Sequence, residues 1–414
     1  MRILLVPIGS AGDVYPFIGI GLELKARGHH VTLYTSDHFR QIVESLGIEF
    51  ASMSRVEDFQ SMLEDPRLWH PTRAFEFVAR QAFLPLTPVC CRFIMDRSKQ
   101  GETLVVASSL AFGARIAQEK AGVPVVTIHL QPSVLQSLYE TPSYGGLDWM
   151  RRLPRPLKKG FYALVEAWTD HVLAPELNRF RASLGLGPVR GILRKWIHSP
   201  LRLIGLFPDW FAAPQPDWPA QLRLTGFPLY DGSGAQPVPA DVQRFFEAGP
   251  APVIFTLGSA MRHARRMFEI SAEACRRLGC RGLFISQFPD QIPPSLPAGV
   301  MAMRYAPFSQ IFPRASVILH HGGIGTTSQS LAAGVPQLVT PFAHDQFDNA
   351  SRVARLGAGE VLHAQRFSLS RLTEKLARLL KDAARQARAR ALKSRLNGPQ
   401  AIQQTCDLIL SRPK

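Results

Sequence analysis

Short runs of aliphatic residues alternate along the chain with longer segments whose apolar residues recur every three or four positions. The strand-like runs of the first half are RILLVPIG, HHVTLYTS, GIEFASM, TLVVASS and PVVTIHL. Between the first two, the segment PFIGIGLELKARGH places Ile18, Leu22 and Ala26 on one helical face and ends at Gly28, a residue type that favours helix termination. The pattern predicts βαβ units, and hence a parallel sheet with helices on both faces.

A second series of the same kind follows in the other half: PVIFTLGS, GLFISQF, VMAMRYAPF, SVILHHGG, PQLVTPF and GEVLHA. Between the two series, residues Pro214–Pro239 are rich in Pro, Gly and Asp, which is typical of a linker. We therefore expect an α/β protein of two Rossmann-like domains, residues 1–213 and residues 214–397 with the linker included. Parallel sheets bind ligands beyond the carboxyl ends of their strands, so functional residues are expected just after strands, in a cleft between the domains.

Length and composition narrow the class of protein. The 414 residues, 46% of them hydrophobic, are ample for two cores and exclude a disordered chain. Five cysteines form no CxxC pair and no cluster with histidine, so we expect neither a disulfide framework nor a metal site. The N-terminal apolar run lacks the length and cleavage site of a signal peptide, and no apolar run approaches the roughly 18 residues that span a bilayer. We expect a soluble, cytoplasmic protein.

Positive charge is the strongest bias of the composition, with 48 Lys and Arg against 32 Asp and Glu. Such an excess is compatible with nucleic acid, an anionic membrane or phosphorylated small substrates as partners. Basic residues gather at residues 151–159, 262–266 and 384–395, but no nucleic-acid module accompanies them. The favoured interpretation is solvated helix faces, with no nucleic-acid partner and at most weak peripheral contact with an anionic membrane at its inner face.

The clearest local signal is the segment SVILHHGGIGTTSQSLAAGVP, residues 316–336, in which a strand, a glycine-rich turn and a helix follow one another. Amides at the helix N-terminus and the helix dipole would attract a diphosphate, and Gly323 and Gly325 would let it approach the backbone closely. A neutral His321 and the Thr326 hydroxyl could each donate a hydrogen bond to it. The alternative is a turn required only for tight packing. Neither a P-loop nor a dinucleotide fingerprint fits, because no Lys follows the glycines and the acidic residue expected on a second strand is missing.

Residues after neighbouring strands extend this predicted anion site. Ser259 follows PVIFT and could support the diphosphate, while Asp345 and Gln346 follow PQLVT and suit recognition of vicinal sugar hydroxyls. Tyr305 follows VMAMR and could stack on a nucleobase. The alternatives are that Asp345 is a turn or N-cap residue of the next helix and that Tyr305 belongs to the core.

The stretch from Tyr305 to Asn349 resembles the donor-binding signature of family 1 glycosyltransferases, which have the GT-B fold. The motif consists of Tyr305 and Pro307, His321 and Gly323, GVP at residues 334–336, and Asp345, Gln346 and Asn349. The resemblance implies two Rossmann-like domains whose parallel sheets face each other across a cleft, with a C-terminal helix of about residues 398–414 packing back on the first domain. It also implies a nucleotide-sugar co-substrate.

Carried over by position, the resemblance implies that Tyr305 stacks on the base and that His321, Gly325 and Thr326 hold the diphosphate. It implies that Ser259 supports the diphosphate from the opposite strand. Asp345 and Gln346 would hold the sugar hydroxyls.

Two positions depart from the plant-type motif of this family. Gln329 stands where that motif has a Glu that binds the ribose diol, and Phe308 stands where it has Gln. The weaker ribose contact leaves deoxyribose acceptable. Segments in both domains, among them IGSAGDVYPFIG, LTGFPLYDGS and FAHDQFDN, resemble the rhamnosyltransferase branch of rhamnolipid synthesis, although HHGGIGTT is closer to the generic family form. That branch implies dTDP-L-rhamnose as donor and a 3-hydroxy fatty acid dimer as acceptor. The alternative is UDP-glucose with phenolic, natural-product or sterol-like alcohols.

Asp13 follows the first strand and is the expected general base, because a carboxylate just before the first helix can accept the proton of an attacking hydroxyl. Plant-type members carry His at this place with an Asp about a hundred residues later, and Ser108 stands at that partner position here. The alternative is that Asp13 only caps the first helix. The expected reaction is an inverting displacement that needs no metal, because amides receive the leaving diphosphate. Apolar surface for the acceptor is expected at Trp69, Phe75, Phe77, Phe83 and the helical region 131–200; the alternative is that these residues belong to the core.

Two other classes of function remain open to test. A non-hydrolysing sugar-nucleotide epimerase would share both Rossmann halves but would not need the clamp at residues 345–349 opposite an acceptor pocket. A basic binding module for nucleic acid or an anionic membrane would be retained on those polymers in a salt-sensitive way.

Overall fold

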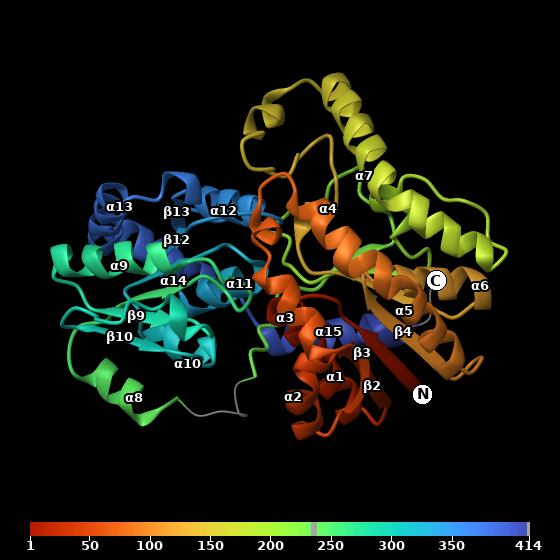
Figure 1. Cartoon of the computed structure of the whole chain (residues 1–414), viewed down its shortest axis with the longest axis horizontal. Helices are drawn as coiled ribbons and strands as arrows, with labels where there is room; N and C mark the ends of the chain where they lie inside the picture. The colour runs from red at the N-terminus through yellow and green to blue at the C-terminus, as the bar shows by residue number, and fades with distance from the viewer. Residues whose placement is uncertain (233–237, 412–414) are drawn as a thin grey trace. The chain divides into compact units, whose positions relative to one another are not determined.

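The computed structural model describes residues 1–232 and 238–411, which divide into two units (Figure 1). The first unit contains Met1–Gly9, Asp13–Pro228 and helix α15 (Gly398–Leu410), and the second contains Ser10–Gly12 and Leu229–Asn397. The predicted boundary after residue 213 precedes a short strand, β7 (Leu222–Leu224), which continues the first sheet. Residues 233–237 of the predicted linker and residues 412–414 of the predicted C-terminal helix lie outside the described residues.

Each unit is built on one parallel sheet, as the alternating pattern predicts. The first sheet has the order β3-β2-β1-β4-β5-β6-β7 and the second has the order β10-β9-β8-β11-β12-β13. The remaining strands of the first sheet are β1 (Arg2–Val6), β2 (His30–Ser36), β3 (Glu49–Ser54), β4 (Thr103–Ser108), β5 (Val125–His129) and β6 (Arg202–Gly205). Those of the second are β8 (Val253–Thr256), β9 (Gly282–Ile285), β10 (Val300–Met303), β11 (Val317–His320), β12 (Gln337–Val339) and β13 (Gly359–Val361).

Helices connect the strands as crossover elements in both units. Besides α15, the first unit has α1 (Ala11–Ala26), α2 (Arg40–Ser45), α3 (Val56–Glu64), α4 (Ala74–Val78), α5 (Leu84–Arg97), α6 (Phe112–Ala121) and α7 (Arg155–Ser183). The second has α8 (Ala240–Glu247), α9 (Arg265–Leu278), α10 (Phe308–Ile311), α11 (Ile324–Ala333), α12 (Gln346–Arg355), α13 (Leu369–Lys381) and α14 (Ala383–Lys393). Among the helices of the described ranges, none combines the length and the apolar composition needed to cross a bilayer.

Both faces of the first sheet are buried under helices. On one face, side chains such as Leu4, Val105 and Val125 form a core with apolar residues of α5, α6 and α7. Helix α15 returns to this unit near α1, where the Cys406 Sγ lies 3.7 Å from the carbonyl oxygen of Ile20. The C-terminal helix therefore completes the first unit although the second unit precedes it in the chain.

The second sheet is covered in the same way. Ile254, Leu283 and Ile318 form a core with residues of α8, α10 and α11 on one face. On the other face Phe284 of β9 contacts Phe268 of α9, with ring centroids 5.3 Å apart. The central strands of both sheets are buried on two sides, which explains why they are continuous apolar runs, whereas the edge strands β3, β7, β10 and β13 are partly exposed.

The strand orders locate the ligand-binding edge of each sheet. In the first sheet β1 lies between β2 and β4, and in the second β8 lies between β9 and β11, so the order reverses at these strands. In open parallel sheets the crevice at this switch point, beyond the carboxyl ends of the strands, is where ligands bind. Asp13 follows β1, while Ser259 and His321 follow β8 and β11.

Candidate active site

The switch point of the second sheet brings the loops after β8 and β11 together. The two strands pair in parallel with Thr256 opposite His320, so residues 257–259 and 321–323 leave the sheet side by side. Gly258 has φ +85°, and a Cβ atom placed on it would lie 2.6 Å from Cε1 of His321. The absence of a side chain at residue 258 therefore makes room for the imidazole.

The His321 ring is held between two glycines and is uncharged. On its other side, a Cβ atom on Gly323 would lie 2.5 Å from Nε2 of His321. Burial, and then the neighbouring His320 and His344, lower the pKa of His321 to about 3. The buried Nδ1 atom has no hydrogen-bond partner within the described ranges. A neutral imidazole with one N–H is what the sequence predicts for this position.

His320, the other member of the pair, is part of the scaffold. Its Nδ1 accepts a hydrogen bond from the Gly322 N–H at 3.1 Å, and its Nε2 lies 2.8 Å from Oε1 of Gln337 on β12. Because Nδ1 accepts, Nε2 must carry the proton and donate it to Gln337. Burial lowers the pKa of His320 to about 4, so the ring stays neutral near pH 7 and fixes the glycine turn.

Helix α11 presents its N-terminus at this turn. Gly323 occupies the N-cap position without a side chain, and Gly325 and Thr326 lie in the first turn. Gly322 has φ +95°, and a Cβ atom on it would lie 2.8 Å from Cγ1 of Val339, so the close turn requires glycine. The first amides of a helix have no partner within the helix and carry the positive end of its dipole. The predicted residues Gly323, Gly325 and Thr326 thus surround a helix start suited to an anion.

Asp345 connects the starts of two helices. It occupies the N-cap position of α12, as the alternative interpretation expects, but its side chain makes no capping bond there. Instead, its Oδ2 accepts hydrogen bonds from the Ile324 N–H at 3.2 Å and from Nδ2 of Asn349 at 2.7 Å. The same Asn349 amide donates to the carbonyl oxygen of Gly322 at 2.9 Å. The carboxylate therefore lies directly at the start of α11, where the sequence expects a sugar contact.

Part of the Gln346 side chain is already bonded within the protein, so only the rest of it is available for sugar recognition. Its Oε1 accepts hydrogen bonds from the backbone N–H groups of Phe342 at 2.8 Å and Ala343 at 3.2 Å. The side chain is buried, so Nε2 is the atom left to donate to a ligand. His344, between these residues, has φ +58°, an unusual conformation for a non-glycine residue. The sequence pattern did not single out His344.

Two linker residues, also missed by sequence reasoning, position the predicted base-binding side of the site. The Tyr305 hydroxyl donates to the carbonyl oxygen of Asp231 at 2.7 Å, and the Asp231 carboxylate accepts from the Ser309 N–H at 2.7 Å. Nε2 of the buried Gln329 donates to the carbonyl oxygen of Leu229 at 2.9 Å. Each contact joins residues at least 74 positions apart, so no local pattern could reveal it.

In the first unit, Asp13 lies within helix α1. The sequence pattern predicts a place just before that helix, and this prediction is wrong. The helix begins at Ala11, so the carboxylate is in the first turn, where the helix dipole stabilises its charged form. Gly9 has φ +138°, and any Cβ atom on it would overlap the Asp13 carboxylate. Ser108, at the end of the neighbouring strand β4, is buried, and its Oγ has no partner among the described residues.

The aromatic residues expected to form acceptor surface divide into two groups. Phe77 and Phe83 are each 8% exposed and belong to the core, so that part of the expectation is wrong. Phe75 is half-buried, and its ring contacts that of Trp168 on α7 at 5.2 Å between centroids. Trp69 ends a short 3-10 helix, Pro66–Trp69, and is half-buried.

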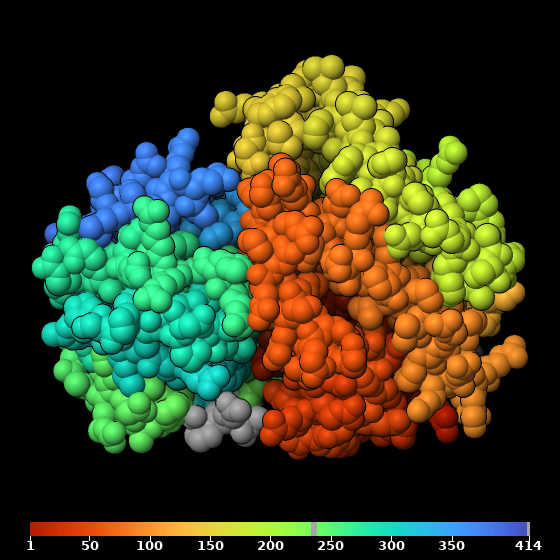
Figure 2. Space-filling model, viewed as in Figure 1, coloured from red at the N-terminus to blue at the C-terminus, as the bar shows by residue number. Residues whose placement is uncertain are grey.

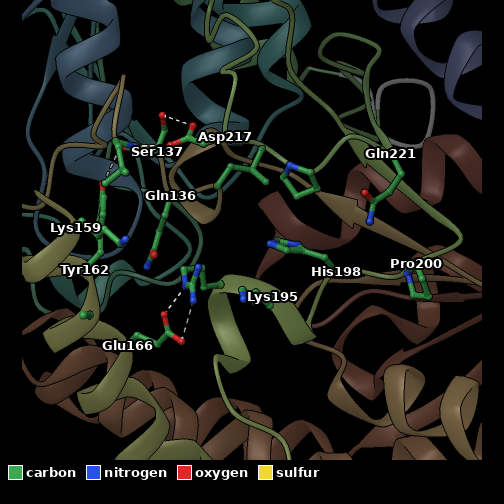
Figure 3. Close-up of a pocket in the computed structure, with 15 residues that line it drawn as sticks. Gln136, Ser137, Lys159, Tyr162, Glu166, Lys195, His198, Pro200, Asp217 and Gln221 are labelled. Atoms are coloured by element: carbon green, nitrogen blue, oxygen red, sulfur yellow. Dashed lines mark hydrogen bonds and ion pairs between the residues drawn. The ribbon is translucent and has the colours of Figure 1, made fainter. Parts of the chain in front are cut away.

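A cavity of about 560 Å³ lies in the first unit (Figure 3). Leu135 and Leu138 come from the loop after β5, Tyr162 and Lys159 come from α7, and His198 precedes β6. Burial lowers the pKa of His198 to about 4, so this ring is neutral near pH 7. The cavity combines apolar walls with charged groups, a composition found in small-molecule sites.

Comparison with known proteins finds two family models that match parts of the chain. Residues 3–140 match the glycosyltransferase family 28 N-terminal domain, and residues 287–406 match the C-terminal domain described as erythromycin biosynthesis protein CIII-like. O-mycaminosyltylonolide 6-deoxyallosyltransferase of Streptomyces fradiae is 28% identical over 99% of this chain and 97% of its own length. A sterol 3-beta-glucosyltransferase of Saccharomyces cerevisiae is 27% identical over 86% of this chain, which spans 31% of that protein.

Solved structures show the same architecture. The glycosyltransferase of kitacinnamycin covers 99% of this chain and 98% of its own, with a TM-score of 0.73 and 20% identity. The spinosyn rhamnosyltransferase SpnG complexed with thymidine diphosphate covers 98% of this chain and 100% of its own, with a TM-score of 0.68 and 19% identity. These likenesses confirm the GT-B fold. The two domain matches and the glycosyltransferase relatives show that the chain is a nucleotide-sugar-dependent glycosyltransferase, similar to family 28 in residues 3–140 and to the EryCIII-like type in residues 287–406.

Proposed function

We propose that the chain transfers L-rhamnose from dTDP-L-rhamnose to a hydroxyl of a lipid-like acceptor such as a 3-hydroxy fatty acid dimer. The reaction inverts the anomeric carbon and uses no metal ion. The observation that carries the proposal is the uncharged His321 between two glycines at the start of α11, because it offers a hydrogen bond and helix amides to a diphosphate at one point. We assign the donor diphosphate to His321, Gly323, Gly325 and Thr326, with Ser259 from the loop after β8.

We also assign residues to the sugar and to the base of the donor. Asp345, at the start of α11, accepts from the sugar hydroxyls, and Gln346 donates to them through Nε2. Tyr305 stacks on the base while its hydroxyl is anchored on the Asp231 carbonyl. This hydrogen bond restricts the orientation of the Tyr305 ring.

A deoxyribose donor is supported by Gln329. Its amide donates to the Leu229 carbonyl, so residue 329 supplies no carboxylate for a ribose diol. Among the similar proteins, one is named a 6-deoxyallosyltransferase, and one structure is a rhamnosyltransferase complexed with thymidine diphosphate. Both names concern 6-deoxy sugars, as rhamnose is. The sterol 3-beta-glucosyltransferase relative supports the alternative, transfer of glucose from UDP-glucose to a sterol-like or other natural-product alcohol.

The cavity of the first unit supports an amphiphilic acid as acceptor. Its apolar wall includes Leu135, Leu138 and Tyr162. Lys159 and Lys195 also line it, and among the described residues neither forms an ion pair. Hydrocarbon chains fit the apolar wall, and a carboxylate fits the two ammonium groups. A fatty acid dimer has both parts, whereas a sterol lacks the carboxylate.

The chemistry that we propose is a single displacement. Asp13 takes the proton of the acceptor hydroxyl as that oxygen bonds to the anomeric carbon. The bond from this carbon to the diphosphate breaks on the opposite face, which inverts the configuration. The negative charge that develops on the diphosphate is stabilised by the α11 amides and His321, which are already oriented before reaction.

Ligand-dependent thermal unfolding tests the donor assignment. At about 100 times its dissociation constant, a ligand adds roughly 2.7 kcal/mol of stability, so dTDP should shift unfolding at lower concentration than UDP does. Product analysis with labelled dTDP-L-rhamnose and a 3-hydroxy fatty acid dimer should then show label on the lipid. Preference for UDP-glucose and a sterol would favour the alternative, and an altered sugar still attached to the nucleotide would indicate an epimerase. Loss of activity in EDTA, restored by a divalent cation, would contradict metal independence.

A further inference from the structure

Exposed apolar side chains are concentrated in one segment of the chain. The large apolar residues with the greatest exposure are Met1, Val89, Tyr139, Leu147, Trp149, Leu157, Leu164 and Trp168. Six of these eight lie between residues 139 and 168. The segment leads through a short 3-10 helix, Asp148–Arg152, into the first half of α7, and it is yellow in Figure 1. Figure 2 shows its side chains on the surface of the first unit.

Helix α7 turns an apolar stripe toward solvent. Leu157, Phe161, Leu164 and Trp168 recur at intervals of four, three and four residues, so they lie on one helical face. Leu164 is 72% exposed and Leu157 is 58% exposed. Another face of the same helix packs against the rest of the unit, and Tyr162 and other residues are buried there. The stripe lies mainly outside the core, although Trp168 also contacts Phe75.

Basic residues flank this stripe. Residues 139–168 contain Arg151, Arg152, Arg155, Lys158 and Lys159 against Glu140, Asp148 and Glu166, a net charge of +2, and of the five basic residues only Lys158 is buried. Glu166 is already paired with Arg194. Arg155 lies over the ring of Tyr139, with its guanidinium carbon 4.0 Å from the ring centroid. We call the exposed apolar and basic residues of 139–168 the α7 ridge.

We propose that the α7 ridge docks on the surface of an anionic lipid bilayer. A helix with Trp and Leu on one face and Lys and Arg beside them lies in the plane of the bilayer interface, its apolar side chains buried below the headgroups. Charge complementarity favours an anionic lipid surface as the partner, because the whole chain carries a net charge of +16. The proposal goes beyond the transfer reaction and does not depend on the donor or the acceptor.

Vesicle co-sedimentation of the full chain tests this docking. The vesicles are phosphatidylcholine alone, or equimolar phosphatidylcholine and phosphatidylglycerol, without donor or acceptor. We expect binding to the anionic vesicles that weakens at high salt. The combined variant Trp149→Ser, Leu157→Ser, Leu164→Ser should reduce partitioning at least about tenfold, because each change withdraws apolar area from the interface. Arg152→Gln with Arg155→Gln should reduce it by about fivefold per charge.

A matched control is Val89→Ser, which removes an apolar side chain that is 41% exposed but lies outside the ridge. This variant should bind as the parent chain does, and all variants should unfold at the parent temperature. Equal binding to neutral and anionic vesicles, or unchanged binding of the combined variant, would overturn the proposal. Sedimentation velocity without lipid provides a second test. A parent dimer that dissociates in the combined variant would assign the ridge to self-association instead.

Discussion

Replacing Gln329 by glutamate tests whether the amide at residue 329 is required by its hydrogen bond to the linker rather than by contact with the ribose. The Gln329 side chain is 7% exposed, and its Nε2 donates to the Leu229 carbonyl oxygen at 2.9 Å. A glutamate has nearly the same shape but carries an acceptor where Gln329 has its donor. At pH 8 the variant therefore loses one hydrogen bond and sets a buried carboxylate against a carbonyl oxygen.

The expected cost follows from these two effects. A net hydrogen bond contributes about 1 kcal/mol, and a buried polar group left without its partner costs a further 1–3 kcal/mol, more when it is charged. We therefore expect a loss of about 3 kcal/mol at pH 8. For a unit of roughly this size, 1 kcal/mol shifts the unfolding temperature by about 2–4 °C, so unfolding of the second unit should fall by about 6–12 °C.

The loss should depend on pH with a definite sign. Burial raises the pKa of the introduced carboxyl group in the folded state, so the folded state binds more protons than the unfolded state and stability falls as pH rises. At low pH the protonated carboxyl can again donate to Leu229. The difference between variant and parent chain should therefore be small near pH 4 and grow toward pH 8. Gln365→Glu, at an exposed residue of the same unit, is the control and should cost little at any pH.

Calorimetric unfolding of both variants and the parent across this pH range measures the effect. A Gln329→Glu variant that equals the parent at pH 8, or whose deficit does not change with pH, would show that the Leu229 contact does not select the amide. A gain in UDP affinity over dTDP would show that residue 329 reaches the ribose, contrary to the donor argument.

Other substitutions test the remaining parts of the site. Asp13→Asn should leave dTDP affinity intact and lower kcat on the order of 10² or more, and near-normal turnover would exclude Asp13 as the base. Gly258→Ala should weaken dTDP binding and cost about 1–3 kcal/mol, whereas Gly279→Ala has a similar backbone strain but open space, so calorimetry and titration of both separate strain from contact with His321. The pKa of His320 is lowered to about 4 and that of His321 to about 3, so the unfolded chain binds more protons and stability should fall as pH drops from about 6.5 to 4. An unfolding temperature unchanged over that window would refute the burial of neutral rings.

Most of the regular elements could be predicted because the central strands are buried apolar runs between polar segments. The pattern missed β6 and β7. The tripeptide LRL lies within a Pro-rich stretch and has no periodicity, and only its pairing with β6 makes it a strand. The pattern also began the first helix too late. The segment PFIGIGLELKARGH was expected to form this helix, with Asp13 before it, but α1 starts at Ala11 and includes Asp13. Boundaries depend on hydrogen bonds to neighbouring elements, which a local pattern does not contain.

The sequence predicts where the residues of the candidate site lie, but it does not predict their hydrogen-bond partners. Strand ends in a parallel sheet converge, so residues after β8, β11 and β12 could be placed at one edge from sequence alone. Their bonds to the linker could not: Asp231 meets Tyr305 across 74 residues, and Leu229 meets Gln329 across 100. The functional motif marks what contacts the ligand, while the residues that fix those side chains are distributed over the unit.

The two adjacent histidines have different roles because successive side chains along a strand point in opposite directions. Side chains of successive residues in an extended segment point in opposite directions. His320 is the last residue of β11 and reaches Gln337 on the neighbouring strand, so its ring is committed to the turn. His321 therefore points the other way, toward Gly258 after β8, where a side chain on residue 258 would exclude it. The position of the imidazole depends both on the alternating direction of side chains along the strand and on the missing side chain at Gly258. Moving the histidine by one residue would therefore remove the imidazole from the helix start. This requirement explains why the glycine after β8 and the histidine after β11 must be considered as one unit of the site.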